Sequence, residues 1–189
     1  MTSDIDERTG WPDALCVVLE EYPRDTWSDT RSAMARFWID KHNYIRRQSE
    51  ALRSANDEYR AERTDAARFG GFIAPRLQRF LAELHGHHQV EDFHYFPAFR
   101  SAEPRLATGF DVLARDHELI HQGIVDVVES VNAFLAGIGP DAGKDDARNI
   151  AADRYIAASN LLHERLDRHL ADEEDLIIPL MIREDGGAG

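Results

Sequence analysis

Two stretches of the sequence share one spacing of histidine, glutamate and proline: HHQVEDFHYFP (87–97) and HLADEEDLIIP (169–179). In each, a glutamate follows the first histidine by four residues, and a proline follows that glutamate by six. Imidazole and carboxylate groups bind transition metals, and they also transfer protons. Because residues four apart lie on one face of a helix, each stretch can direct a histidine and a glutamate to the same place.

Helices are expected to position these residues, because the sequence shows long helical periodicity and no sustained alternation typical of strands. Thr26 or Ser28 is a candidate cap of the first helix, and Gly70 and Gly71 are expected to loosen the start of the second. The segment 137–146, rich in Gly, Pro and Asp, is the clearest loop. The four predicted helices span 27–63, 72–100, 110–136 and 147–183. Their short connections predict an all-α, up-down-up-down antiparallel four-helix bundle.

The chain is expected to hold one domain. We assign residues 27–185 to the bundle, 1–26 to an N-terminal extension with room for one short helix, and 186–189 to a flexible tail.

The composition limits the classes of partner. The 189 residues carry a formal net charge of −13, which argues against nucleic acid or an anionic membrane, because either would need a basic surface. The single cysteine, Cys16, cannot form an internal disulfide, which suits a reducing, cytoplasmic setting. The acidic start of the sequence lacks the apolar run of a secretory signal, and no apolar run approaches the roughly 20 residues of a membrane-spanning helix.

The helical period indicates which side chains face the centre of the bundle, since positions i, i+4, i+7 and i+11 return to one stripe. Seven ionisable side chains fall on the otherwise apolar stripes: His42, His87, Glu91, His117, His121, His169 and Glu173. Burying so many polar groups without compensation would cost several kcal/mol each. We therefore predict that metal lies between them.

The other histidines have different predicted places. His88 lies at the flank of its stripe and is a reserve ligand, and His94 lies on the buried arc as a candidate hydrogen-bond partner of a ligand. His85 is expected in solvent, and His163 at a flank of its helix.

The acidic run at 172–175 is expected to be a solvated face apart from Glu173. Glu174 points away from the stripe by the same test, and it stays in reserve as the alternative ligand.

The predicted ligand set indicates the kind of metal site. Seven ligands exceed the four of a usual zinc site, and the set is too rich in nitrogen for calcium or magnesium. In a pair of six-coordinate irons, five imidazoles, two bridging carboxylates and one bridging oxo or hydroxo group would leave one position open. Two irons are therefore the expected cofactor, with manganese or zinc as alternatives.

The arrangement resembles the hemerythrin family, specifically the bacterial hemerythrin-like (HHE cation-binding) domains, over about residues 27–183. The residues that match the family's ligand pattern are His42 on the first helix, His87 and Glu91 on the second, His117 and His121 on the third, and His169 with Glu173 on the fourth. The hydrophobic-Pro pairs Phe96-Pro97 and Ile178-Pro179 also match. In the oxygen-carrying hemerythrins the last carboxylate follows its histidine by five residues, which would select Glu174 here, whereas the HHE-type spacing selects Glu173.

The resemblance implies a non-haem di-iron centre that binds O2 or a related small ligand, such as NO or peroxide, for storage, delivery or sensing. One alternative is a di-iron enzyme that removes peroxide or NO. Another is an iron or redox sensor without catalysis, for which residues 1–26 are a candidate partner surface. The sequence shows no motif for a phosphate, an organic cofactor or a nucleophilic triad, which favours binding over elaborate catalysis.

Overall fold

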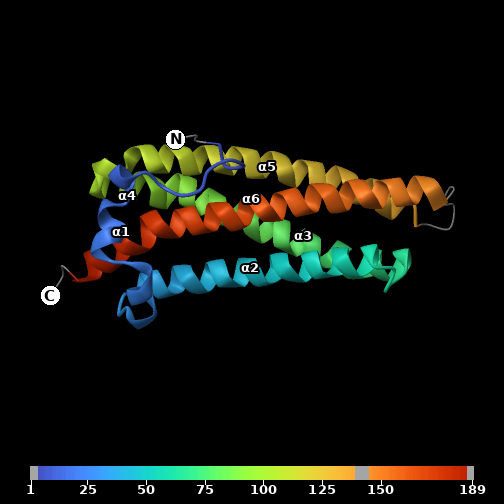
Figure 1. Cartoon of the computed structure of the whole chain (residues 1–189), viewed down its shortest axis with the longest axis horizontal. Coiled ribbons are helices and arrows are strands. Elements are labelled where there is room, and N and C mark those ends of the chain that lie inside the picture. The colour runs from blue at the N-terminus through green and yellow to red at the C-terminus, as the bar shows by residue number, and fades with distance from the viewer. Residues whose placement is uncertain (1–3, 139–144, 187–189) are drawn as a thin grey trace. The chain divides into compact units, whose positions relative to one another are not determined.

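The computed structural model describes residues 4–138 and 145–186, and this part of the chain is helical and contains no strand. Figure 1 shows the helices along the chain. In order they are η1 (Asp13–Leu15), α1 (Val17–Glu21), η2 (Arg24–Asp29), α2 (Ala33–Arg60), α3 (Ala66–Val90), η3 (Glu91–Tyr95), α4 (Phe96–Ala102), η4 (Pro104–Leu106), α5 (Ala107–Ala136) and α6 (Asp145–Gly186). The all-α prediction is confirmed. The up-down-up-down order and the division of the chain at 27 and 186 stay predictions.

The chain forms two compact units, and the long helices contribute to both. The first unit comprises Met1–Tyr44, His87–Glu118 and Arg165–Gly189, and the second comprises Ile45–Gly86 and Leu119–Glu164. No helix of the described residues is long and apolar enough to cross a membrane.

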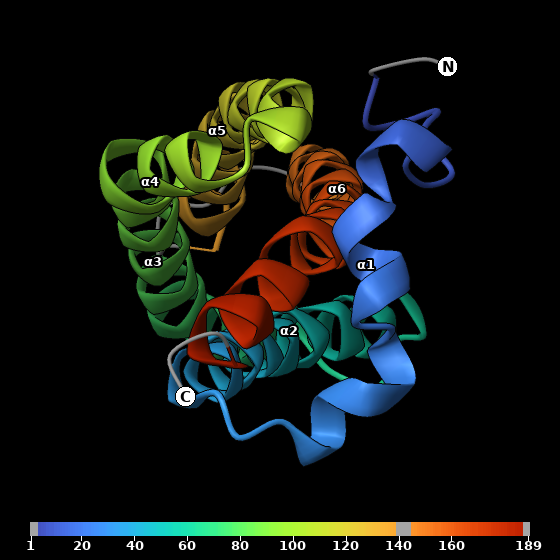
Figure 2. The same cartoon turned by 90° about the vertical axis from the view of Figure 1, so that its left-hand side faces the viewer.

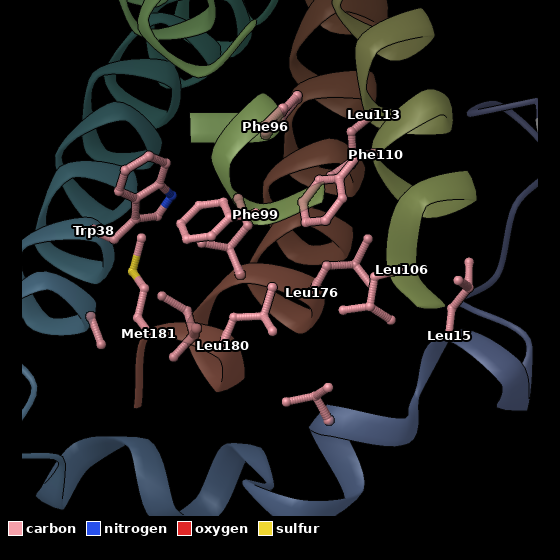
Figure 3. Close-up of a cluster of buried hydrophobic side chains, with 14 of the residues drawn as sticks. Leu15, Trp38, Phe96, Phe99, Leu106, Phe110, Leu113, Leu176, Leu180 and Met181 are labelled. Atoms are coloured by element: carbon pink, nitrogen blue, oxygen red, sulfur yellow. The ribbon is translucent and has the colours of Figure 1, made fainter. Parts of the chain in front are cut away.

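An apolar cluster forms the core of the first unit. Figure 3 shows Phe99 between Trp38 and Phe110, and the rings of Phe96 and Phe110 lie 5.5 Å apart. The N-terminal segment, residues 4–32 before α2, contributes Leu15, Val18 and Trp27 to this cluster. Figures 1 and 2 both show α1 beside the C-terminal part of α6. The extension therefore packs as part of the first unit, with one short α-helix and two 3-10 turns.

The second unit has an aromatic core. The rings of Tyr59 and Phe69 stack at 4.4 Å, and those of Phe69 and Phe134 lie 5.4 Å apart. Gly70 lies inside α3, where an added Cβ would come within 2.7 Å of the Ile138 side chain. The prediction that Gly70 and Gly71 loosen the helix is wrong, because Gly70 instead allows close packing.

A buried polar cluster also lies in the second unit. Oγ of Ser49 lies 2.7 Å from Nδ1 of His163, and Oγ of Ser159 lies 3.1 Å from its Nε2. His163 is only 1% exposed, so its predicted place at a flank is wrong. The two hydroxyls satisfy both ring nitrogens, which is why this histidine is tolerated in the core.

The start of α2 differs from the prediction. Ser32 caps the helix, because its Oγ accepts a hydrogen bond from the N–H of Ala35 at 3.1 Å. Thr26 and Ser28, the predicted caps, lie in η2 instead. The extended backbone of Thr30 separates η2 from α2.

Most of the predicted loop at 137–146 and of the predicted tail lies outside the described residues.

A π-helical turn, η3, follows α3 at the ligand-bearing stretch. The N–H of Phe96 donates to the carbonyl of Glu91, five residues back. Pro97 follows this turn; it has no N–H and crowds the carbonyl of an ordinary preceding turn, so a wider turn relieves the crowding. The extra residue rotates the chain beyond Glu91, which leaves Phe96 buried and His94 exposed. The prediction that His94 lies on the buried arc is wrong for this reason.

Candidate metal centre

The two histidines of α5 have different environments. His117 is buried, whereas His121 is exposed, and its ring lies 5.7 Å from that of the exposed His85. Four fully buried side chains of α5 recur every seven residues, Leu113, Ile120, Val127 and Phe134, and Leu106 of η4 continues the series. Side chains that repeat every seven residues form a buried stripe with about 3.5 residues per turn. The face of a straight helix, with about 3.6 residues per turn, rotates away from this stripe by about 20° per heptad. The prediction that His121 lies on the buried stripe is wrong because it assumed the straight-helix period.

The other six predicted ligands converge in the first unit, and His88 joins them. Their ligand atoms form two groups, each with all atoms within 4.8 Å of one another. One group is His42, His87, Glu91 and Glu173, and the other is His88, Glu91, His117 and His169. Glu91 belongs to both groups, so the geometry suits two ions that share a carboxylate.

The carboxylate of Glu91 has one oxygen toward each group. Its Oε1 lies 2.8 Å from Nε2 of His87, and its Oε2 lies 3.5 Å from Nε2 of His117. The first pair is within hydrogen-bond distance, yet neither atom makes a hydrogen bond. Both lone pairs are instead free to face a common cation.

Glu173 makes a second link between the groups. Its Oε1 lies 3.7 Å from Nε2 of His42, and its Oε2 lies 3.4 Å from Nε2 of His169. Nε1 of Trp38 donates to Oε1 at 2.9 Å, which fixes the orientation of this carboxylate. Glu173 is therefore placed, like Glu91, to bridge two ions.

The sequence His87-His88-x-x-Glu91 explains how one helix serves both groups. At about 100° per residue, His87 lies roughly 40° to one side of Glu91, and His88 roughly 60° to the other. The two imidazoles therefore diverge on either side of the shared carboxylate. The adjacent histidines before Glu91 were the sequence signal that His88 also faces the centre. The helical-period argument missed it because it assumed one buried stripe on each helix.

The centre is buried and holds unmatched polar atoms. Its seven side chains are 0–9% exposed. Within the described residues, buried ligand atoms without a hydrogen-bond partner include Nε2 of His42, His87 and His88, both carboxylate oxygens of Glu91, and Oε2 of Glu173. Nε2 of His117 and Nε2 of His169 face each other at 3.0 Å. Buried polar atoms are normally paired, so this concentration of unpaired donor atoms fits a cation-binding centre.

Most of the imidazoles are held neutral. Burial lowers the pKa of His87 to about 3 and lowers the pKa of His88 and of His117 as well. A neutral imidazole has the free lone pair that a metal ligand needs. Burial would also lower the pKa of His169, but Asp116 and Glu173 outweigh it and raise the value to about 9.

The two carboxylates titrate apart. Burial and the neighbouring charge of Glu173 raise the pKa of Glu91. Burial opposes the ionisation of Glu173 too, but the charges of His42 and His169 outweigh it, and the pKa of Glu173 is lowered. Without metal, the pair therefore favours one protonated and one ionised carboxyl group, which a cation would convert to two carboxylates.

Further carboxylates orient the ligands from outside. Nδ1 of His42 donates to Glu174 at 2.9 Å, and Nδ1 of His117 donates to Asp92 at 2.8 Å. Such bonds fix the tautomer that leaves Nε2 toward the metal. Glu174 is buried, so the prediction that it points away into solvent is wrong.

The acidic run at 172–175 is covered by the N-terminal segment. Nε of Arg8 donates to Asp172 at 2.8 Å, and Nε of Arg24 donates to Asp175 at 2.7 Å. The prediction of a solvated face is wrong because the helical period shows which side faces the bundle, but not what packs on the other side. Nothing in the spacing of the sequence pointed to Arg8.

Comparison with known proteins agrees with this geometry. The family model described as the hemerythrin HHE cation binding domain matches residues 33–181. No curated protein and no solved structure matches the chain. The matched range includes every residue of the two ligand groups and begins after the N-terminal segment. The predicted resemblance is confirmed, and the chain belongs to the hemerythrin HHE cation-binding domain family.

Proposed function

We propose that the two ligand groups hold a non-haem di-iron centre that binds O2, or a related small ligand such as NO or peroxide, for storage, delivery or sensing. The observation that carries the proposal is that two buried groups share Glu91 and are linked again by Glu173. The ligands are His42, His87, His88, Glu91, His117, His169 and Glu173. His88 takes the place that the sequence assigned to His121. The four long helices would form the up-down-up-down bundle of the family.

The chemistry of the donor set supports iron. Five imidazole nitrogens and two bridging carboxylates make a nitrogen-rich set, whereas ferritin-like di-iron centres use more carboxylates and fewer histidines. A pair of ferrous ions would supply electrons to a bound small ligand. Manganese or zinc in the purified protein is the alternative that metal analysis decides.

Aromatic side chains pack around the buried centre, which supports a small ligand. The ring of Phe96 stacks on that of His117, with the ring centres 5.3 Å apart. The centre of the Trp38 ring lies 6.1 Å from that of His42 and 6.0 Å from that of His87. These aromatic side chains and the low exposure of the ligands exclude bulk water. Exclusion of water slows the loss of electrons to solvent and protects a reversible complex.

The polar neighbours of the ligands favour binding over catalysis. Asp92 is bonded to His117, Glu174 to His42, and Trp38 to Glu173. Removal of peroxide or NO needs a group that delivers protons. These side chains are already engaged in orienting ligands, so reversible binding is the simpler use of the centre.

The proposal is tested with full-length protein loaded with ferrous iron under argon. We expect about two irons per chain by elemental analysis, and an absorption band that forms in air and disappears on return to argon. Glu91→Ala, which removes the shared ligand, is expected to bind little iron and give no band, and His121→Ala to behave as the wild type.

Other outcomes would select other functions. Rapid bleaching with gas evolution on addition of peroxide, or catalytic consumption of NO, would indicate an enzyme. Iron-dependent binding of a protein partner without reversible ligand binding would indicate a sensor. Wild-type protein that binds no iron would contradict all three.

A further inference from the structure

A buried arginine of the N-terminal segment reaches the metal centre. Arg8 is 3% exposed. Its Nη1 donates to Oδ1 of Asp116 at 3.3 Å, its Nη2 donates to Oδ2 of the same carboxylate, and its Nε donates to Asp172. The guanidinium therefore holds Asp116 by two parallel bonds, the most directional contact available to a carboxylate.

Asp116 in turn faces a ligand. Its Oδ2, the oxygen that accepts from Nη2 of Arg8, lies 3.6 Å from Nδ1 of His169. That nitrogen has no hydrogen-bond partner among the described residues, and the Asp116 carboxylate is the charged group that faces it. It is the ring nitrogen opposite Nε2, and a carboxylate at this position sets the orientation and donor strength of a metal-bound imidazole. His42 and His117 also have a carboxylate at Nδ1, from Glu174 and Asp92 respectively.

The segment fixes Arg8 on both sides. Ile5 is 3% exposed, and Nε1 of Trp11 donates to the backbone carbonyl of Asp172 at 2.7 Å. The guanidinium also lies over the Trp11 ring, 5.1 Å from its centre. These contacts give Arg8 one position, which an exposed arginine would not have.

We propose that Arg8 is a positioning residue of the metal centre: the N-terminal segment, which lies outside the matched family range, controls His169 through Asp116. This rests on the proposed di-iron site with His169 as a ligand. The two N–H groups of the Arg8 guanidinium fork fix the plane of the Asp116 carboxylate. The positive charge of the guanidinium offsets the negative charge of Asp116 beside His169. Without that charge, Asp116 makes the imidazole a stronger donor, which favours the oxidised metal pair.

The test uses the full chain loaded with iron, and it measures iron affinity and the reduction potential of the centre. Arg8→Met is expected to weaken iron binding about 10–100-fold and to lower the potential. Arg8→Lys keeps the charge and loses the fork, so its potential is expected to stay closer to the wild type while its affinity still falls. Circular dichroism checks that each variant keeps its helices.

Arg24→Met is the matched control, because Arg24 binds α6 from the same segment through Asp175 and the carbonyl of Ala171, neither of which is a proposed ligand. It is expected to leave the potential unchanged. Equal shifts in Arg8→Met and Arg24→Met would show that the segment acts only by packing and would overturn the proposal. Wild-type affinity and potential in Arg8→Met would overturn it as well, with the di-iron site intact. Failure of the wild type to bind iron would overturn both proposals.

Discussion

His87 and His88 are neighbours in the sequence, yet their imidazoles belong to different ligand groups. His87 lies with His42 and Glu173, and His88 lies with His117. The centres of the two adjacent rings are 5.9 Å apart. One short stretch of the chain therefore contributes to both ligand groups, and Glu91 belongs to both.

This arrangement predicts which histidine completes the centre. His88→Ala is expected to lower the bound iron from about two per chain to one or fewer, because it removes an imidazole from one group. His121→Ala is expected to keep the wild-type content, since that side chain is exposed. Elemental analysis of both variants, prepared identically, measures the difference. Loss of iron from His121→Ala alone would restore the original assignment from the sequence.

The neighbouring glutamates of α6 are expected to act differently. Glu173→Ala removes a carboxylate that we propose bridges the two irons, so it is expected to abolish binding of the proposed iron pair. Glu174→Ala removes only the hydrogen bond to His42, so it is expected to keep the iron content at saturating iron and to weaken affinity about 10–100-fold. Iron titrations of the two variants separate these outcomes. The reverse order of severity would make Glu174 the ligand.

Removal of metal is expected to destabilise the fold, because it leaves the buried ligand atoms unmatched. At a free metal concentration of about 100 times the dissociation constant, binding contributes about 2.7 kcal/mol. For a domain of this size, that corresponds to a fall in Tm of roughly 5–10 °C on chelation. Calorimetry with and without chelator measures it. Glu173→Ala is the control and should show no fall; an equal fall there would trace the effect to the chelator.

The buried His163 predicts a dependence of stability on pH in the metal-free protein. Burial, with a smaller contribution from Arg53, lowers its pKa to about 4. The unfolded chain takes up this proton near pH 6.5, so the stabilisation is complete above about pH 6.5 and is lost as pH falls toward 4. Its loss by pH 4.5 amounts to about 2–3 kcal/mol.

His163→Gln, which keeps a polar side chain near Ser49 and Ser159, is the variant that isolates this effect. Urea unfolding at pH 7.5 and pH 4.5 should show a smaller loss of stability in the variant than in the wild type. The contributions of the ligand histidines cancel in that comparison. Identical losses would mean that His163 does not titrate differently on folding.

Where a helix is regular, its period was enough to predict the burial of its residues. On α6 the predicted stripe of Leu162, Leu166, His169, Glu173 and Leu176 is buried throughout. On α2 the stripe around His42 is also correct. In both helices the hydrophobic pattern is long and uninterrupted, so the average period places each side chain well.

The errors in the site have local physical causes. His121 was placed wrongly because a seam with a seven-residue repeat departs from the straight-helix period. His94 was placed wrongly because the π-helical turn adds a residue after Glu91, and only Pro97 hints at it in the sequence. Arg8 could not have been found from periodicity, since its partners Asp116 and Asp172 are distant along the chain.

The separation of Arg8 from Asp172, 164 residues along the chain, has a consequence for how the protein folds. Contacts of such high sequence separation require most of the chain to be ordered first, because the entropy of closing the intervening loop must be overcome. Hairpins of neighbouring helices can form early from local contacts. The metal centre needs α6 beside α2, and the N-terminal segment can dock only when α6 is in place. Binding of metal is therefore expected to belong to the last steps of folding. Docking of the N-terminal segment, which places Arg8 on Asp116 beside His169, is expected to come at the end.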